Sequence, residues 1–357
     1  MEKSEYIKGR GAQINTHNHF LQHNYIAENE YLNYCYLEGE NTESTRTQYI
    51  EIFPKTIVNK VVSPDLGLCY SMNPYQGCEH GCIYCYARNT HEFWGYSAGL
   101  DFEKKILFKR NAPQLLEEKL TSKNWKPFVI ALSGNTDCYQ PIEKELEITR
   151  NVLKVFLQYK HPVSIITKNA LILRDLDILS ELAKDNLVHV SISVTSLKES
   201  TRRLLEPRTA SIQKRLKTIE ILSQNNIPVN VMMAPIIPSI NSDEIFSVVK
   251  KISELGALSA AYTIVRLNGA IGEIFTDWVN KTLPDRANKI LNQIMDCHNG
   301  HLNDSHYGRR IKGDGKIAEQ VAIQFQLARN KYLKGKKLPP LNYTLFDKDQ
   351  SSQLKLF

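Results

Sequence analysis

The feature that most limits the possible folds is a regular alternation of apolar runs and helix-like segments between residues 128 and 265. Apolar runs rich in β-branched residues predict buried strands, and they fall at 128–132, 163–167, 188–194, 229–234 and 260–265. Segments with apolar residues three or four positions apart lie between them, at 142–159, 171–183, 212–224 and 243–255. Strands that alternate with helices of this length predict parallel βαβ units with right-handed crossovers.

One more expected strand, at 68–74, brings the number of parallel strands to six. Six strands fall short of the eight in a complete parallel barrel. We therefore expect an α/β fold with a partial (β/α)6 parallel barrel over residues 61–270. We expect an N-terminal extension over residues 1–60 and a C-terminal tail over residues 341–357. Between the barrel and this tail, we expect a basic region over residues 271–340 with helices at 286–297 and 316–332.

Three cysteines follow the first expected strand with the spacing C-x3-C-x2-C: Cys78, Cys82 and Cys85. Three thiolates can each hold one iron of a cubane [4Fe-4S] cluster, which leaves the fourth iron without a protein ligand. Gly77 and Gly81 each precede a cysteine, where the backbone must turn tightly. The alternative is a structural zinc site whose fourth ligand is Cys69, His80 or His91. Zinc sites more often pair two C-x2-C motifs, and this chain has one.

This cysteine loop, with Tyr84 before the third cysteine, resembles the motif of the radical S-adenosylmethionine (radical SAM) superfamily. The resemblance implies that the open iron binds SAM and that one electron from an external donor cleaves SAM to a 5′-deoxyadenosyl radical. Within the superfamily, segments 56–60, 82–86, 167–175 and 206–210 are similar to spore photoproduct lyase and its relatives. The lyase acts on a thymine dimer in DNA, so the resemblance favours a nucleic acid substrate and a role like DNA repair. An RNA, peptide or small-molecule substrate is the alternative, as is a non-catalytic metal protein that binds nucleic acid.

The resemblance also implies a SAM site at the C-terminal ends of the strands, where the sites of parallel barrels gather. Lys168 ends the third strand, where its ammonium would pair with the SAM carboxylate. Ile236 follows the fifth strand and would form an apolar wall for adenine. The remaining candidates are small or polar residues at the ends of the second and fourth strands, namely Ser133, Gly134, Asn135, Thr136, Ser191 and Ser193.

The candidate catalytic residues are Tyr84, Tyr86 and Cys138. In the lyase, tyrosines beside the third cluster cysteine assist radical relay, and a cysteine on the second strand returns a hydrogen atom. Gly134 stands where that cysteine is expected, and Cys138 lies close by, beyond Asp137. This departure concerns the lyase reaction and leaves the SAM chemistry unchanged. Packing around the cluster is the alternative role for the two tyrosines.

The positive charge of the chain is concentrated near its C-terminus. The net charge is +7, and residues 308–337 hold nine Lys or Arg residues against Asp314 and Glu319. Such a stretch predicts contact with a polyanion, with DNA favoured, and a solvated helix face is the alternative.

The last five residues, Gln353–Phe357, resemble the peptide with which bacterial replication and repair proteins bind the sliding clamp. A short peptide of this kind docks by placing its large side chains in pockets of a partner. The alternative is a tail that folds back onto its own barrel.

The seven cysteines are an odd number, and three of them belong to one motif, which fits a reducing compartment better than a disulfide framework. The first thirty residues are polar, and no apolar run reaches the ~18 residues of a membrane helix. These features predict a cytoplasmic protein without a membrane segment.

Overall fold

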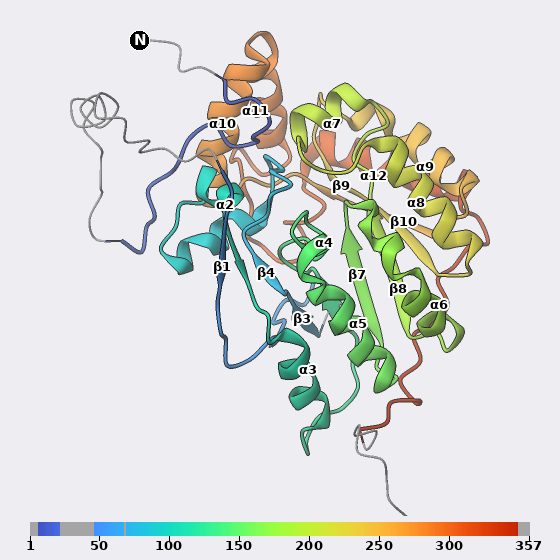
Figure 1. The fold of residues 1–357 in the computed structure, drawn as a ribbon. Helices are drawn as coiled ribbons and strands as arrows, with labels where there is room; N and C mark the ends of the chain where they lie inside the picture. Colours follow the sequence, from blue (N-terminus) through green and yellow to red (C-terminus); the bar gives the residue numbers. More distant parts are fainter. Residues whose placement is uncertain (1–5, 22–45, 68, 349–357) are drawn as a thin grey trace, which may run out of the picture.

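A seven-stranded sheet forms the centre of the computed structural model, which describes residues 6–21, 46–67 and 69–348 (Figure 1). The strand order is β10-β9-β8-β7-β6-β3-β2. Every neighbouring pair is parallel except β2 and β3. The six predicted parallel strands are therefore confirmed, as is the partial (β/α)6 barrel. The strands are β2 (Val58–Lys60), β3 (Tyr70–Met72), β6 (Ile130–Leu132), β7 (Val163–Thr167), β8 (Val188–Ser193), β9 (Val229–Ile236) and β10 (Ser259–Ile264).

Helices cover the outer face of this sheet (Figure 1). Alternate strand residues such as Val163, Ile165 and Val190 are buried against helix residues such as Phe156 and Leu179. The residues between them, such as Ser164 and Ser191, lie on the opposite face because successive side chains of a strand alternate. The covering elements are α4 (Glu143–Leu146), α5 (Ile148–Gln158), η2 (Ala170–Asp175), α6 (Leu176–Lys184), α8 (Ile212–Gln224), η3 (Ser242–Glu244) and α9 (Ile245–Glu254).

Several short elements were not predicted from the sequence. A three-stranded sheet has the order β1-β5-β4, in which β1 covers Gln48–Glu51 and the unpredicted β4 and β5 have two and four residues. Helix α7 (Glu199–Leu205) precedes α8, and α3 (Ala112–Thr121) precedes β6. The other unpredicted elements here are β4 (Tyr75–Gln76), η1 (Tyr86–Trp94), α2 (Leu100–Lys104) and β5 (Lys105–Phe108). Strands β1 and β2, in contrast, lie within residues 47–62, where alternating apolar and polar residues predict short strands.

Helices also follow β10, as predicted. Residues 286–297 and 316–332 were expected to be helical, and they form α11 (Ala287–Asp296) and α12 (Gly315–Tyr332). The unpredicted α10 (Ile271–Thr282) buries Phe275 and Trp278, and η4 (Pro284–Arg286) leads from it into α11. Helix α12 shares the main apolar core with the barrel through Val321 and Phe325. No helix in the described ranges has the length and apolar character needed to cross a membrane.

An ion pair spans the open side of the partial barrel, whose edge strands are β2 and β10. The loop after α11 joins β10 through a hydrogen bond from Ile264 N to Ile311 O at 2.9 Å. From this loop, the Arg310 guanidinium donates two hydrogen bonds of 2.7 Å to the carboxylate of Asp65, in the β2–β3 connection. Ser63 accepts another from Arg310. The two edges of the sheet are thus joined by a bidentate contact.

Candidate active site

The cysteine loop lies between β4 and η1, where its backbone is held from several sides. Cys78 N donates to Phe102 O at 2.8 Å, and Ile83 N donates to Leu205 O at 3.0 Å. Cys78 and Cys82 are buried, Cys85 is half-buried, and all three thiols are free. The predicted ligands therefore lie together on one rigid loop.

Gly77 and Gly81 are required by the close packing of this loop. Both have left-handed backbone conformations, with φ of +75° and +65°. A Cβ atom would lie 2.6 Å from Lys105 O at Gly77 and 2.8 Å from Glu103 Oε2 at Gly81. Side chains at either position would push the loop away from its support.

The donor set is compatible with a multi-iron cluster, because three thiols lie on one loop and each can hold a separate iron. Within the described ranges, no three His, Cys, Asp or Glu side chains are close enough to hold one metal ion. Burial raises the pKa of the Cys78 and Cys82 thiols, so their thiolates need a bound cation for stability. The proposed fourth zinc ligands have other neighbours: His80 Nδ1, within the loop, lies 3.3 Å from Asp137 Oδ2, His91 packs against Phe102, and Cys69 is exposed.

The N-terminal arm is fixed to this loop through two buried charges. Gly11 N and Ala12 N donate to the Glu103 carboxylate at 3.1 and 2.8 Å. Glu103 forms an ion pair of 2.5 Å with Arg88, and neither side chain is exposed. Arg88 Nε in turn donates to Cys82 O at 3.0 Å. The arm, Glu103 and Arg88 therefore form a continuous support behind Cys82.

We expect Gly11→Ala to release the arm, because its Cβ would lie 1.8 Å from Gly81 O. Overpacking of this kind costs about 1–3 kcal/mol of unfolding free energy, and denaturant titration measures it. Limited proteolysis should also cut the arm faster. The control is Gly272→Ala in α10, where the nearest atom lies 3.3 Å away. Equal destabilisation by both changes would contradict this role of Gly11.

The end of β6 meets the cysteine loop through the predicted segment Ser133–Thr136. Ser133 has φ of +72°, a conformation that is rare for residues with side chains and clusters at functional sites. The Tyr86 phenol donates to Gly134 O. Asn135 Nδ2 donates to Thr90 Oγ1 at 2.9 Å, and Thr136 Oγ1 donates to Tyr75 O at 2.6 Å. These contacts place the segment beside β4 and η1, the two elements between which the cysteine loop lies.

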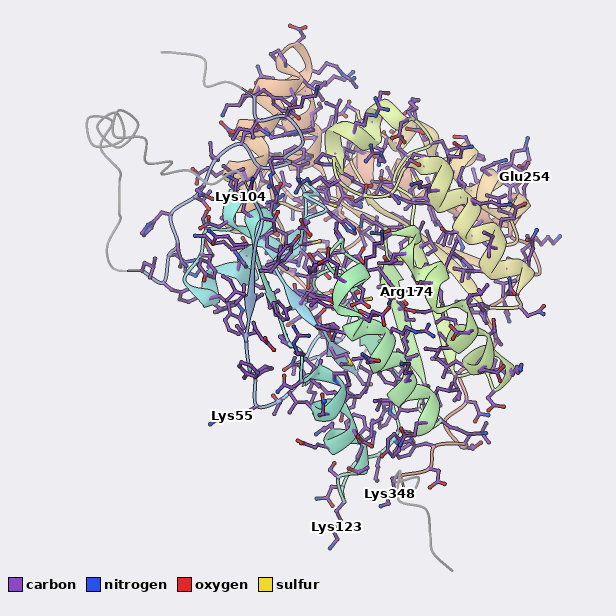
Figure 2. The ribbon with its side chains drawn as sticks, in the orientation of Figure 1. Lys55, Lys104, Lys123, Arg174, Glu254 and Lys348 are labelled. Carbon is purple, nitrogen blue, oxygen red and sulfur yellow. The ribbon has the colours of Figure 1, made fainter. Side chains whose placement is uncertain are left out.

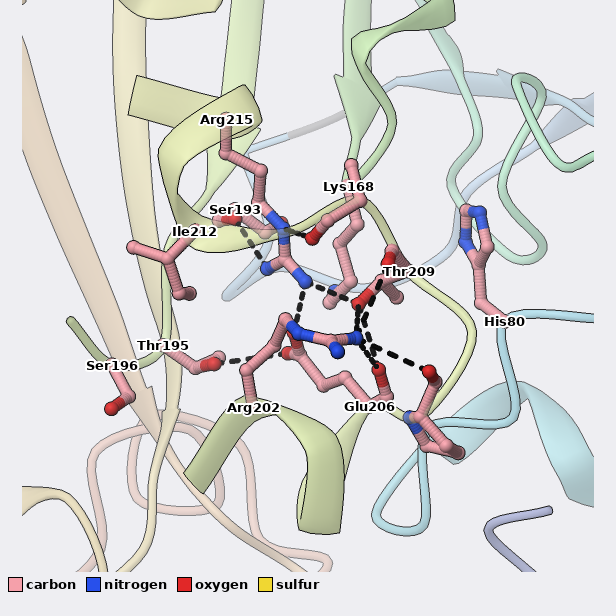
Figure 3. Close-up of polar contacts among 12 residues, drawn as sticks. His80, Lys168, Ser193, Thr195, Ser196, Arg202, Glu206, Thr209, Ile212 and Arg215 are labelled. Carbon is pink, nitrogen blue, oxygen red and sulfur yellow. Dashed lines mark hydrogen bonds and ion pairs between the residues drawn. The ribbon is translucent and has the colours of Figure 1, made fainter. Parts of the chain in front are cut away.

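Lys168, at the end of β7, extends toward the group formed by Glu206, Arg215 and Thr209 (Figure 3). Its ammonium lies 6.0 Å from the centre of the Tyr84 ring. Burial lowers its pKa, but Cys82 and Glu206 more than offset that effect, so the pKa of Lys168 lies above its ordinary value. Figure 3 marks no hydrogen bond or ion pair between this ammonium and the other residues drawn there. Lys168 is therefore a charged donor available to a ligand.

Glu206 is a buried residue of this site to which the sequence analysis gave no role. Arg215 Nη2 donates to its carboxylate at 2.5 Å, and neither side chain is exposed. Thr195 Oγ1 donates at 3.0 Å, and the Tyr84 phenol also donates. Burial alone would raise the pKa of Glu206, but Arg215, Lys168 and Tyr84 hold that pKa at about 2. The similarity of segment 206–210 to the lyase was the available signal.

Asp137 connects the cysteine loop to two strand ends. Besides His80, its carboxylate accepts from Thr167 Oγ1 and from Lys168 N, both at 2.8 Å. Burial would raise the pKa of Asp137, but His80 and the backbone N–H groups of Lys168 and Tyr139 hold it at about 2. A permanent carboxylate therefore fixes the backbone from which Lys168 extends.

The other predicted site residues lie on or near the barrel strands without a hydrogen bond to the described cysteine loop. Ser191 Oγ accepts from Asn230 Nδ2 at 3.1 Å, and Ser193 O accepts from Arg215 Nη1 at 3.0 Å. Ile236 and Cys138 are fully buried in the main apolar core. Their assigned roles stay predictions.

Comparison with known proteins gives the family. Residues 72–252, half of the chain, match the model described as the radical SAM superfamily. This chain belongs to the radical SAM superfamily. The superfamily uses a [4Fe-4S] cluster and SAM, so the predicted cofactors and enzyme type are those of its family.

Two relatives in this superfamily are uncharacterized proteins. One, from Mycobacterium tuberculosis, is 29% identical over 242 residues, which cover 67% of this chain and 71% of the relative. The other, from Methanocaldococcus jannaschii, is 27% identical over 250 residues, covering 70% and 89%. Neither relative's name indicates a substrate.

The solved radical SAM structures with this fold include spore photoproduct lyase. The lyase complexed with dinucleoside spore photoproduct matches with a TM-score of 0.59 at 13% identity, over 80% of each chain. A mutant lyase with bound AdoMet and the same dinucleoside matches with a TM-score of 0.59 at 14% identity, again over 80% of each chain. At this identity the likeness describes the fold.

Proposed function

We propose that this radical SAM enzyme holds its [4Fe-4S] cluster on Cys78, Cys82 and Cys85, cleaves SAM reductively and acts on a nucleic acid base. When bound, the cluster and SAM supply a 5′-deoxyadenosyl radical after one electron arrives from an external donor. The observation that carries the proposal is the position of the three thiols, on one buried loop beside the strand ends that present Lys168. A structural cluster would not require this cation.

The charges at the strand ends favour a ligand that presents a carboxylate group. Arg215 and Glu206 neutralise each other in a closed ion pair. Lys168 then adds one positive charge without a direct partner among the described residues. A ligand carboxylate would complete this arrangement with a charge-assisted hydrogen bond. We assign Lys168 to the carboxylate of SAM, with Ser133 and Asn135 at the neighbouring strand end.

The two candidate relay tyrosines differ in their access to a substrate. Tyr84 is buried, and its phenol is held by Glu206. Tyr86 is 51% exposed and borders Gly134. Of the two, Tyr86 has the surface that a substrate can reach, so we assign it to the substrate side of the site. Cys138 is fully buried, so a role in returning a hydrogen atom requires transfer through intervening groups.

The likeness to a lyase solved with a dinucleoside photoproduct supports a nucleic acid substrate. A base inside a duplex must leave its stack to reach a buried site, and a damaged base does so at lower cost. We therefore propose DNA with a damaged base as the first substrate class to test. A cytoplasmic location and a role in DNA repair belong to the same proposal.

The test is an anaerobic assay on protein reconstituted with iron and sulfide, reduced with dithionite and given SAM. We expect release of methionine and 5′-deoxyadenosine, increased by UV-irradiated DNA more than by intact DNA, RNA or a peptide. No release of 5′-deoxyadenosine under any condition would overturn the SAM chemistry. Release that only RNA or a peptide increases would overturn the proposed substrate class.

A further inference from the structure

A cluster of unneutralised cations lies at the C-terminal end of α12. The chain has no acidic residue between Glu319 and Asp347. None of the cations in this interval forms an ion pair within the part of the chain that the structure describes. We call this cluster the basic patch, and it consists of Arg329, Lys331, Lys334, Lys336 and Lys337.

Two earlier cations of the same stretch, Arg309 and Arg310, are different. Arg309 donates to Asp304 at 2.6 Å, and Arg310 is engaged by Asp65 across the barrel opening. Neighbouring carboxylates therefore largely neutralise Arg309 and Arg310, whereas the five cations of the basic patch form a group without ion pairs among the described residues.

The basic patch borders a hollow of about 510 Å³. Arg329, Lys334 and Lys336 line it together with Ser259 and Asn330, and none of its lining residues is acidic. Lys336 is held in place because its ammonium donates to Ser253 O at 2.7 Å and to Ser253 Oγ at 3.0 Å. The hollow thus combines positioned cations with neutral hydrogen-bonding groups.

Glu254 of α9, which follows the Ser253 that Lys336 contacts, does not neutralise the basic patch. Glu254 lies at the rim of the molecule (Figure 2), 4.0 Å from Lys250 and 3.9 Å from Lys251. Helix α12 ends at Tyr332, and its dipole favours cations within the last turn. That effect accounts for Arg329 and Lys331 but not for the cations at 334, 336 and 337.

We propose that the basic patch and its hollow bind the phosphodiester backbone of a nucleic acid. The hollow includes Ser259, the first residue of β10, so it lies at the end of the barrel opposite the cysteine loop. Six residues of strand span about 20 Å, so this site is separate from the reacting centre. The inference that the polyanion is a nucleic acid rests on the proposed function. The basic patch would anchor a long strand of DNA whose damaged base enters the barrel at the opposite end.

The test is the salt dependence of binding to fluorescent single-stranded and duplex DNA of about two helical turns, in the full-length protein. The patch variant carries Arg329→Gln, Lys334→Gln and Lys336→Gln. Each lost phosphate contact lowers the slope of log affinity against log salt by about 0.9 for duplex DNA, so we expect a drop of about 2–3. Reductive cleavage of SAM without DNA should stay at the wild-type rate, which shows that the variant is folded.

The matched control removes three exposed lysines from the outer helices: Lys154→Gln, Lys184→Gln and Lys217→Gln. It should leave the slope unchanged. Equal slopes for the wild type and the patch variant would overturn the inference, as would an equal loss in the control. Failure of the wild type to bind DNA, with SAM cleavage intact, would also overturn it while leaving the radical SAM chemistry standing. Tighter binding of the protein to anionic lipid vesicles than to DNA would overturn the inference that the partner of the basic patch is a nucleic acid.

Discussion

Cys82→Ala protein, reconstituted with iron and sulfide without oxygen, should lack the visible absorption of an iron–sulfur cluster and release no 5′-deoxyadenosine. Cys82 is one of only three thiols on the loop, so its loss leaves two ligands for a four-iron group. Changes to groups that merely support ligands cost about 10–100-fold in metal affinity, and loss of a ligand should exceed that. Iron and sulfide analysis with electron paramagnetic resonance measures the result.

The control for this prediction is Cys297→Ala. Cys297 is also a buried free thiol, but it follows α11 and belongs to no predicted ligand set. It should keep the full iron content. A Cys82→Ala protein with wild-type iron and absorption, or a wild-type protein that holds stoichiometric zinc when purified without oxygen, would contradict the cluster assignment.

Lys168→Ala should weaken SAM binding by about 10–100-fold, because a hydrogen bond to a charged group contributes roughly 1.5–3 kcal/mol. Iron content should not change, since Lys168 extends from the end of β7 and not from the cysteine loop. Glu206 keeps its ion pair with Arg215 in this variant, so the protein should remain folded. Anaerobic equilibrium dialysis with labelled SAM measures the affinity.

Two variants sharpen this second test. Lys168→Arg keeps the positive charge and should recover part of the affinity, whereas Lys154→Ala removes an exposed lysine of α5 and should change nothing. SAM affinity that is unaltered in Lys168→Ala would show that another group binds the carboxylate. Loss of iron in the same variant would instead assign Lys168 a structural role.

The barrel strands were predictable where apolar β-branched residues form long runs. The predicted strand at 163–167 matches β7. The predicted strand at 229–234 begins where β9 begins, and β9 continues for two more residues, to Ile236. The smaller sheet was predictable only in part: alternating apolar and polar residues at 47–62 predict short strands and include β1, whereas β4 has only two residues. Helix α10 was not predicted because it lies beyond the strand–helix alternation, which ends with β10.

Within the site, the features encoded by local spacing were predictable and those made by distant contacts were not. Cys78, Cys82 and Cys85 lie within eight residues, and Lys168 directly follows a predicted strand. Glu206, in contrast, acquires its role from Tyr84, which is 122 residues away. No sequence pattern reports such a contact. The clamp-like peptide Gln353–Phe357 lies outside the described residues and stays a prediction.

The contact between Asp65 and Arg310 has a consequence for how the protein is made. These residues are 245 positions apart, and contacts of such long range form late because chain closure must precede them. During synthesis, the strands β3 to β10 can assemble before residue 310 has left the ribosome. The ion pair between Asp65 and Arg310, which joins the two edges of the sheet, cannot form until that moment. Nascent chains stalled before residue 310 should therefore expose the edges of β2 and β10 to chaperones, although every parallel strand is already complete.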